Sequence, residues 1–197
     1  MDTRQGVWRP GAIMWRELAT TDPDRTTAFY EQLLGWTHHD SQMGGGMGVY
    51  RHFAVNGVDF AGGYQLGPQM AGVPSHIMHY LSVPDVDATL AAAVAAGAQV
   101  MMGPHDIPDV GRAVYVRDPQ GATIALFRDL KGDAPVSLPP YPVGWPCWET
   151  LATTDKDGSV AFYTGVAGMH ASDFFGNTVL GSGPNPEDGV ADVEPVQ

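Results

Sequence analysis

Short segments in which hydrophobic and polar residues alternate recur along the chain, and segments with helical spacing lie between them. Alternation is typical of strands with one buried face, whereas apolar residues spaced three or four apart are typical of helices. The N-terminal part predicts a strand, a helix and three further strands, at residues 36–40, 49–55 and 58–66. The following part predicts the same order, with its last three strands at residues 99–102, 112–117 and 123–127.

A direct repeat supports this order. Residues 15–22, Trp-Arg-Glu-Leu-Ala-Thr-Thr-Asp, recur as residues 148–155, Trp-Glu-Thr-Leu-Ala-Thr-Thr-Asp. The pair Phe-Tyr at 29–30 recurs at 162–163 in the same register, and a weaker copy of the strand-to-aspartate pattern covers 80–85. A repeat of this kind indicates that one structural unit occurs several times, and here the sequence predicts three related units.

Each predicted helix is preceded by an aspartate and followed by a glycine. The aspartates are Asp22, Asp85 and Asp155, and the glycines are Gly35, Gly97 and Gly168. A carboxylate at the N-cap accepts hydrogen bonds from the free amides of the first turn. Glycine adopts the left-handed conformation that ends many helices. These residues predict where all three helices begin and end.

One unit of about 60 residues, with a single helix on a small sheet, buries too little apolar surface to be stable alone. We therefore predict that units 8–68 and 75–130 share one curved sheet and form a single domain over 8–130. The fold class that follows is α+β, with paired βαβββ units forming a cup-shaped mixed sheet and helices outside.

The rest of the chain is expected to be less regular. Residues 1–7 are expected to form an N-terminal arm, and the Pro/Gly-rich residues 131–144 a linker. Residues 145–176 then begin a third, incomplete βαβββ unit. Residues 177–197 are rich in Gly, Pro, Asp and Glu, so we expect an acidic, disordered tail there.

The composition argues against some classes of binding partner but says little about an activity. The chain has 10 Lys and Arg against 22 Asp and Glu, a net charge of -12, which argues against nucleic acid and anionic membranes as partners. No apolar run is long enough to cross a bilayer, and the N-terminus lacks a secretory signal. A single cysteine, Cys147, excludes an internal disulfide and fits a cytoplasmic location.

The most specific stretches are Phe-Tyr-Glu-Gln-Leu-Leu-Gly-Trp at 29–36 and Asp-Pro-Gln-Gly at 118–121. Together with the order of elements, they resemble the vicinal oxygen chelate superfamily of glyoxalases, bleomycin-resistance proteins and extradiol dioxygenases. The chain is most similar to the tandem-cup, antigen-type glyoxalase-like proteins, with the second cup truncated. The resemblance implies a small-molecule ligand in the cup, and a homodimer is open because cups of this superfamily often form between subunits.

The resemblance also implies a divalent metal held at four strand positions, and this chain departs from that pattern. The residues at those positions are Trp15, Ala61, Met78 and Ala125. Tryptophan, methionine and alanine offer no suitable ligand atom for a hard or borderline divalent ion. No metal cofactor is therefore expected at the usual positions, although a divalent metal held elsewhere stays open.

Strand alternation selects other candidates for the cup interior. If Trp15 and Met78 point inward, Glu17, His76 and Tyr80 do so as well, and these three are the candidate catalytic residues. Glu17 with His76 could hold a displaced metal or act as an acid–base pair; alternatively, Glu17 is only hydrogen-bonded and His76 solvated. The candidate ligand-binding residues are Trp15, His39, Asp59, Tyr64, Met78, Tyr115 and Phe127.

Three functions remain open at this point. The first is a protein that binds a small aromatic or apolar molecule without metal at the usual positions. The second is a metal-dependent, glyoxalase-like lyase or a dioxygenase- or hydroxylase-type oxidoreductase that uses displaced ligands such as Glu17 and His76. The third is a non-catalytic module that is completed by pairing with another chain.

Overall fold

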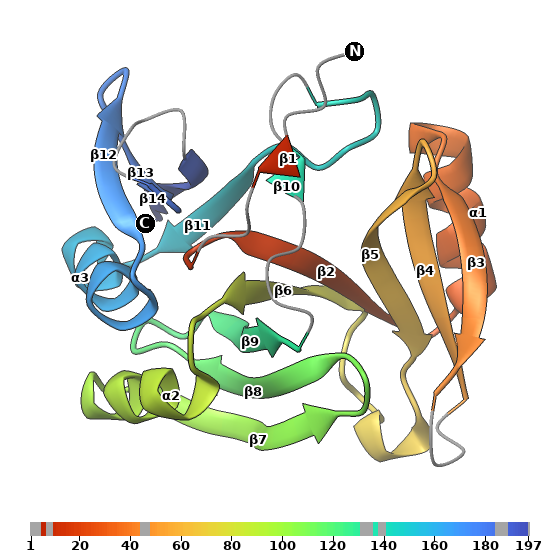
Figure 1. The fold of residues 1–197 in the computed structure, drawn as a ribbon, viewed down its shortest axis with the longest axis horizontal. Coiled ribbons are helices and arrows are strands. Elements are labelled where there is room, and N and C mark those ends of the chain that lie inside the picture. The colour runs from red at the N-terminus through yellow and green to blue at the C-terminus, as the bar shows by residue number, and fades with distance from the viewer. Residues whose placement is uncertain are drawn as a thin grey trace. The chain divides into compact units, whose positions relative to one another are not determined.

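The computed structural model describes residues 5–6, 10–43, 48–130, 136–137, 141–183 and 189–196. Three helices and a larger number of short strands make up most of this part of the chain (Figure 1). None of the helices within it has the length and apolar character needed to cross a membrane.

The first repeat follows the predicted order. It consists of β2 (Ile13–Thr20), α1 (Pro23–Leu34), β3 (Thr37–Gln42), β4 (Val49–Val55) and β5 (Val58–Gln65). The strands β3, β4 and β5 form antiparallel neighbours, and β2 pairs in parallel with β5. A turn with positive φ at both Asn56 and Gly57 joins β4 to β5, as favoured in two-residue hairpins. Figure 1 shows α1 lying along one face of this sheet.

The second repeat has the same order of elements. It consists of β6 (His76–Ser82), α2 (Val86–Ala95), β7 (Gln99–Ile107), β8 (Gly111–Arg117) and β9 (Thr123–Asp129). Its first strand β6 pairs in parallel with β9, and β8 lies antiparallel between β9 and β7. The two repeats contribute to an eight-stranded sheet with the order β3-β4-β5-β2-β6-β9-β8-β7. The predicted α+β class with paired βαβββ units is confirmed.

The third repeat extends further than the sequence predicted. It consists of β11 (Glu149–Thr153), α3 (Lys156–Ala167), β12 (His170–Phe174), β13 (Asn177–Gly181) and β14 (Gly189–Pro195). These strands form a separate sheet in the order β11-β14-β13-β12. The third repeat therefore has the same strand–helix–three-strand order as the other two.

The expectation that the third unit stops at 176 and that 177–197 form a disordered tail is wrong for the described residues. Val179, Leu180 and Val193 are between 1% and 2% exposed, and β14 lies inside its sheet, parallel to β11. The acidic and glycine-rich composition of this segment obscured a few buried apolar residues, which were enough to fix two strands.

The predicted arm and linker contain one short ladder. The backbone of β1 (Gln5–Gly6) pairs with that of β10 (Val136–Ser137). The remainder of the predicted arm, and residues 131–135 and 138–140 of the predicted linker, lie outside the described residues.

The helix caps are those predicted. The carboxylates of Asp22, Asp85 and Asp155 accept hydrogen bonds from backbone amides three residues later, at 2.9–3.0 Å. Gly35 and Gly168 end α1 and α3 in the left-handed conformation. The C-cap of α2 is Ala96, one residue before the predicted Gly97, which follows with a φ of 97°.

The chain divides into two compact units, each with its own core. One unit comprises residues 15–79 with 140–145, and its core is formed by Leu18, Trp36, Phe53, Val55, Phe60 and Ala61. The other comprises residues 1–14, 80–139 and 146–197. In its core, Leu81, Val114 and Leu126 of the second repeat pack with Phe162, Tyr163 and Val193 of the third. The second and third repeats thus share one apolar core.

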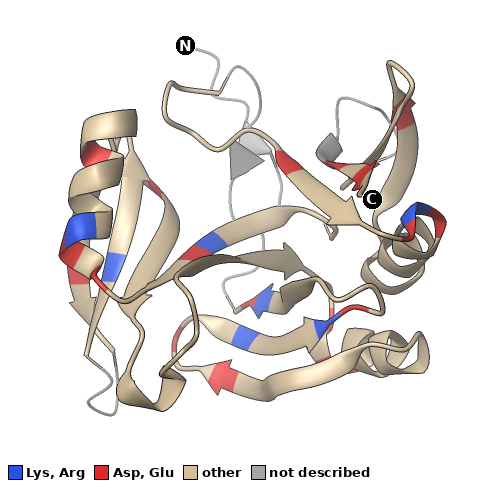
Figure 2. Ribbon diagram, turned by 180° about the vertical axis from the view of Figure 1, so that it is seen from behind, with Lys and Arg blue, Asp and Glu red and all other residues tan. Residues whose placement is uncertain are grey.

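Charged residues are few and dispersed. Figure 2 shows Lys, Arg, Asp and Glu scattered over helices and strands of both units, with most of the chain uncharged. Within each unit, arginines pair with nearby carboxylates: Arg51 with Asp24 and Asp40, and Arg112 with Asp87 and Asp106.

Candidate functional site

The sheet of the first repeat has two chemically different faces. Leu18, Phe53 and Ala61 point to the face that packs with apolar residues of α1, and each is at most 3% exposed. Because side chains alternate along a strand, the opposite face carries the neighbours of these residues. We call this opposite face the polar face; its side chains are Trp15 and Glu17 of β2, His39 and Ser41 of β3, Tyr50 and His52 of β4, and Asp59 and Tyr64 of β5.

A chain of hydrogen bonds crosses the polar face. The indole Nε1 of Trp15 donates to the hydroxyl of Tyr50 at 2.9 Å, and that hydroxyl donates to Oε2 of Glu17 at 3.1 Å. All three side chains are partly buried. Tyr50 can lie across β5 because Gly62 has no side chain, since a Cβ there would overlap the phenol ring. The arrangement holds a carboxylate beside two aromatic rings.

Tyr64 extends this group along β5. It lies opposite Tyr50 in the β4–β5 ladder. Burial raises the pKa of the Tyr64 phenol, and the negative charge of Glu17 raises it further. The Tyr64 hydroxyl therefore keeps its proton at neutral pH and is available as a hydrogen-bond donor.

Two histidines and an aspartate form a second group on the polar face. His39 and His52 lie opposite each other in the β3–β4 ladder, with parallel rings whose centroids are 4.5 Å apart. Oδ2 of Asp59 lies 2.9 Å from Nε2 of His39 and 3.8 Å from Nδ1 of His52. Burial lowers the pKa of His52, and the neighbouring charge of His39 lowers it further, against the opposing effect of Asp59.

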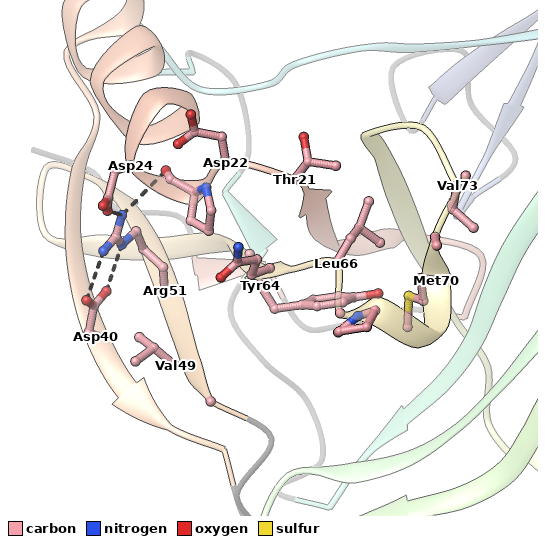
Figure 3. Close-up of a pocket in the computed structure, with 18 residues that line it drawn as sticks. Thr21, Asp22, Asp24, Asp40, Val49, Arg51, Tyr64, Leu66, Met70 and Val73 are labelled. Atoms are coloured by element: carbon pink, nitrogen blue, oxygen red, sulfur yellow. Dashed lines mark hydrogen bonds and ion pairs between the residues drawn. The ribbon is translucent and has the colours of Figure 1, made fainter.

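A hollow of about 1050 Å³ opens at the end of the first-repeat sheet. It lies between the end of β5, the start of α1 and the segment 66–73, which includes the short 3₁₀ helix η2 (Pro68–Met70). Its apolar lining consists of Val49, Tyr64, Leu66, Met70 and Val73, several of which Figure 3 shows around the opening. Tyr64 belongs to both the hollow and the polar face, so the two adjoin.

Three charged residues at the hollow, Asp24, Asp40 and Arg51, pair with one another. Arg51 binds both carboxylate oxygens of Asp40, at 2.8 and 3.0 Å, and donates to Asp24 (Figure 3). It also donates to Thr27 of α1. The Arg51 hydrogen bond lowers the pKa of Asp40 despite its partial desolvation. This cluster links β3, β4 and α1, and the described residues that line the hollow include no cation besides Arg51.

The second repeat has an aromatic cluster of its own. The hydroxyls of Tyr80 and Tyr115 are 2.5 Å apart, and Tyr80 also contacts the ring of Phe127 edge-on. His105 stacks on Tyr115 with an interplanar angle of 11°. Tyr80 and Phe127 are 3% and 4% exposed, so their contribution is mainly to packing, whereas Tyr115 is half-buried.

The predicted site residues therefore fall into groups. Trp15, Glu17 and Tyr64 come together on the polar face, and so do His39 and Asp59. Tyr80, Tyr115 and Phe127 come together in the second repeat. His76 contacts the carbonyl of Pro74 through Nδ1 at 2.9 Å, and Met78 is half-buried on β6. A catalytic role for Glu17, His76 or Tyr80 stays a prediction.

The four positions at which the resemblance implied metal ligands do not suit a divalent ion. The Trp15 indole N–H donates a hydrogen bond to Tyr50, so its nitrogen has no lone pair for a metal. Ala61 and Ala125 have no donor atom and are 0% exposed, and Met78 offers only a soft thioether. We derive no chemistry from a metal at these positions.

Three residues of the polar face were missed from the sequence, Ser41, Tyr50 and His52. Tyr50 and His52 lie in a strand that was predicted, and the period-two pattern places them on the same face, whereas Ser41 lies one residue beyond the predicted end of the preceding strand. The pairing of β4 with β3 and β5, which decides their neighbours, was the information that the pattern lacked.

Comparison with known proteins gives the following similarities. The family model described as Glyoxalase/Bleomycin resistance protein/Dioxygenase superfamily matches residues 12–126. The chain is 42% identical over 171 residues to the "Putative glyoxylase CFP32" of Mycobacterium tuberculosis, covering 86% of this chain and 65% of that protein. It is 29% identical over 177 residues to the "Anthracycline biosynthesis protein DauV" of Streptomyces sp., covering 83% and 63%.

A solved structure supports the fold. The Mn(II)-bound glyoxalase from Novosphingobium aromaticivorans superposes with a TM-score of 0.68 at 20% identity, over 95% of this chain and 62% of that one. The chain thus spans just under two thirds of the length of the relatives that it matches.

Proposed function

The chain belongs to the Glyoxalase/Bleomycin resistance protein/Dioxygenase superfamily, and from this premise we propose that its first repeat binds a small aromatic molecule in the hollow beside Tyr64. Glu17, held in place by Tyr50, accepts from hydroxyl groups of the ligand, and the Tyr64 hydroxyl donates to its carbonyl groups. The observation that carries this proposal is the position of Tyr64, which lines the hollow and lies in the electrostatic field of Glu17.

The chemistry of the site favours an uncharged or weakly polar ligand. Ligand pockets of roughly 300–1,000 Å³ are typically apolar and aromatic, with a few placed polar groups. The lining of the hollow combines one aromatic ring, Tyr64, and several apolar side chains with polar ones, and Arg51, the arginine among its described residues, is already paired with carboxylates. An anion would therefore find no cation reserved for it there.

The name of one relative agrees with an aromatic ligand. DauV is described as an anthracycline biosynthesis protein, and anthracyclines are planar, polycyclic molecules that carry hydroxyl and carbonyl groups. We extend this to the present chain only as a chemical class, a hydroxylated polycyclic aromatic compound. Because Trp15, Ala61, Met78 and Ala125 occupy the usual ligand positions, we expect binding that requires no metal there.

Isothermal titration of the full chain with a hydroxylated anthraquinone tests the proposal. The wild type should bind one equivalent, and treatment with a chelator should leave the affinity unchanged. Tyr64→Ala should weaken binding about tenfold, since an aromatic contact contributes roughly 0.5–1.5 kcal/mol, and Glu17→Gln should weaken it as well.

Tyr30→Phe is the matched control, because Tyr30 belongs to α1 and its ring stacks on Trp36. Its affinity should equal that of the wild type. The proposal fails if the wild type does not bind the anthraquinone, or if Tyr64→Ala and Glu17→Gln bind it as tightly as Tyr30→Phe.

The two alternative functions can be tested separately. A metal-dependent lyase or oxygenase that uses Glu17 and His76 predicts that Glu17→Ala and His76→Ala lose both bound metal and turnover. A module completed by another chain predicts that light scattering of the full chain reports a dimer.

A further inference from the structure

We propose that His39, His52 and Asp59 bind one divalent transition-metal ion of the zinc type on the polar face. The three residues come from the adjacent strands β3, β4 and β5, and one ligand atom of each lies within 4.8 Å of the others. Among the described residues, they are the one group of three or more His, Cys, Asp or Glu side chains that meets this spacing. The group does not include Trp15 or Ala61, so it differs from the ligand positions discussed above.

The donor atoms already lie close to the spacing of a metal site. Zinc binds imidazole nitrogen at about 2.0–2.1 Å and carboxylate oxygen at about 2.0–2.2 Å, which places tetrahedral ligand atoms roughly 3.4 Å apart. The carboxylate of Asp59 lies 2.9 Å from His39 Nε2 and 3.8 Å from His52 Nδ1, on either side of that value. To bind one ion together, His39 and His52 must rotate out of their parallel arrangement, because an imidazole binds metal in the plane of its ring.

The second nitrogen of His52 has the contact expected of a metal-bound imidazole. Nε2 of His52 lies 2.9 Å from the hydroxyl oxygen of Ser41, a residue of β3. A histidine that binds metal through one nitrogen usually donates the other N–H to an oxygen, which fixes the ring orientation and tautomer. With Nε2–H donating to Ser41, the lone pair is on Nδ1, the atom that faces Asp59.

The exposure of the three side chains also suits a metal. The side chains of His39, His52 and Asp59 are 58%, 25% and 37% exposed. An ion at this site would be reached from solvent and would keep water at the position that the protein leaves open.

A plain ion pair is the competing explanation for this cluster. An exposed His–Asp pair contributes little to stability, and it requires only one histidine near the carboxylate. The carboxylate shared by two histidines and the Ser41 contact favour the metal site. The two explanations differ in whether the chain binds one equivalent of metal.

Titration of the chelator-stripped full chain with Zn²⁺, followed by calorimetry, tests the proposal, and Co²⁺ absorption reports the coordination. The wild type should bind one equivalent. His52→Ala and Asp59→Asn should each lower the affinity at least tenfold, and Ser41→Ala should lower it about tenfold, as expected for a residue that orients a ligand.

His38→Ala is the matched control, because His38 is adjacent to His39 on β3 but pairs with Glu31 of α1, away from the polar face. It should bind Zn²⁺ like the wild type, as should Tyr64→Ala, which separates this proposal from that of the aromatic ligand. Asp59→Asn keeps the size of an exposed side chain, so it reports on the metal even if His52→Ala does not fold. The proposal is overturned if the wild type binds no stoichiometric Zn²⁺, or if Asp59→Asn binds it as tightly as His38→Ala.

Discussion

A buried hydrogen bond joins the third repeat to the second, and its removal gives a measurable prediction. The hydroxyl of Tyr163, in α3, donates to Oδ2 of Asp118 at 3.0 Å. The same carboxylate accepts the backbone amides of Gln120 and Ala122 through Oδ1, at 3.0 and 2.8 Å, and so organises the turn after β8. Tyr163 and Asp118 are 4% and 3% exposed, so water cannot replace the lost donor.

Tyr163→Phe removes this hydrogen bond and retains the ring. A hydrogen bond to a charged group contributes about 1.5–3 kcal/mol, and a buried acceptor that loses a partner costs a similar amount. Asp118 keeps its two amide donors, which places the expected loss at about 2 kcal/mol. With a urea dependence of about 2 kcal/mol per molar, the midpoint of unfolding should fall by about 1 M.

Urea unfolding followed by circular dichroism measures this change, and the repeat itself supplies the control. Tyr30 occupies the position of Tyr163 in the first repeat, but its observed contacts are ring contacts with Phe29 and Trp36. Tyr30→Phe should therefore leave the midpoint within about 0.2 M of the wild type, since substitutions away from buried polar contacts change stability little. If the midpoint of Tyr163→Phe is no lower than that of Tyr30→Phe, the hydrogen bond does not stabilise the shared core and the reasoning is wrong.

Three further predictions follow from other contacts. Burial first, and then the charge of Asp118, raise the pKa of Tyr163 well above its ordinary value of 10.0. The stability that depends on its neutral form is present below pH 10 and is lost as the pH rises above 10, so Tyr163→Phe should make the alkaline loss of stability less steep in pH-dependent unfolding. Arg51→Lys cannot keep both hydrogen bonds to Asp40 and should lower the free energy of unfolding, measured in urea, by about 1–2 kcal/mol. Unchanged stability would show that the contacts of Arg51 with Asp40 do not stabilise the fold. Gly62→Ala would displace the Tyr50 ring, so binding of the anthraquinone should weaken in calorimetry while far-UV dichroism stays unchanged; unchanged affinity would exclude Tyr50 from the site.

Local chemistry explains why much of the fold could be predicted from the sequence. An aspartate that caps a helix acts within three residues of itself, as the Asp22 carboxylate does on the amide of Arg25. The Asn56-Gly57 turn and the period-two strands beside it are local in the same way. These signals needed no knowledge of which strands would meet, so helices and most strands were predicted near their observed bounds.

The groups of the candidate site depend on strand pairing, which the pattern of residues does not contain. Asp59 is two residues from Ala61, and simple alternation would place both on the core face. A register shift between Phe53 and Ala54 instead pairs Asp59 with Ala54 and turns it toward His39 and His52. Irregularities of this kind re-aim side chains, and they explain why the histidine–aspartate group could not be assembled from spacing alone.

Comparison of the first and third repeats separates what the fold requires from what the site requires. In the first repeat, Glu17 lies opposite Gly62 in the ladder between first and last strands, and the corresponding ladder of the third repeat places Thr150 opposite Asp192. The carboxylate therefore comes from the first strand in the first repeat and from the last strand in the third repeat. In the third repeat, the Trp148 indole donates to Asp192 directly at 3.1 Å.

Both repeats thus keep a tryptophan and a carboxylate on the same face, but only the first inserts a tyrosine between them. The insertion depends on Gly62, because an aspartate at that position would occupy the space of the Tyr50 ring. A carboxylate beside the tryptophan can therefore be explained by the fold, since it satisfies an indole N–H in each copy. The combination of Gly62, Tyr50 and Glu17 cannot be explained in this way, because the third repeat forms its sheet without it. We therefore propose that this combination, together with the adjoining Tyr64, serves ligand binding.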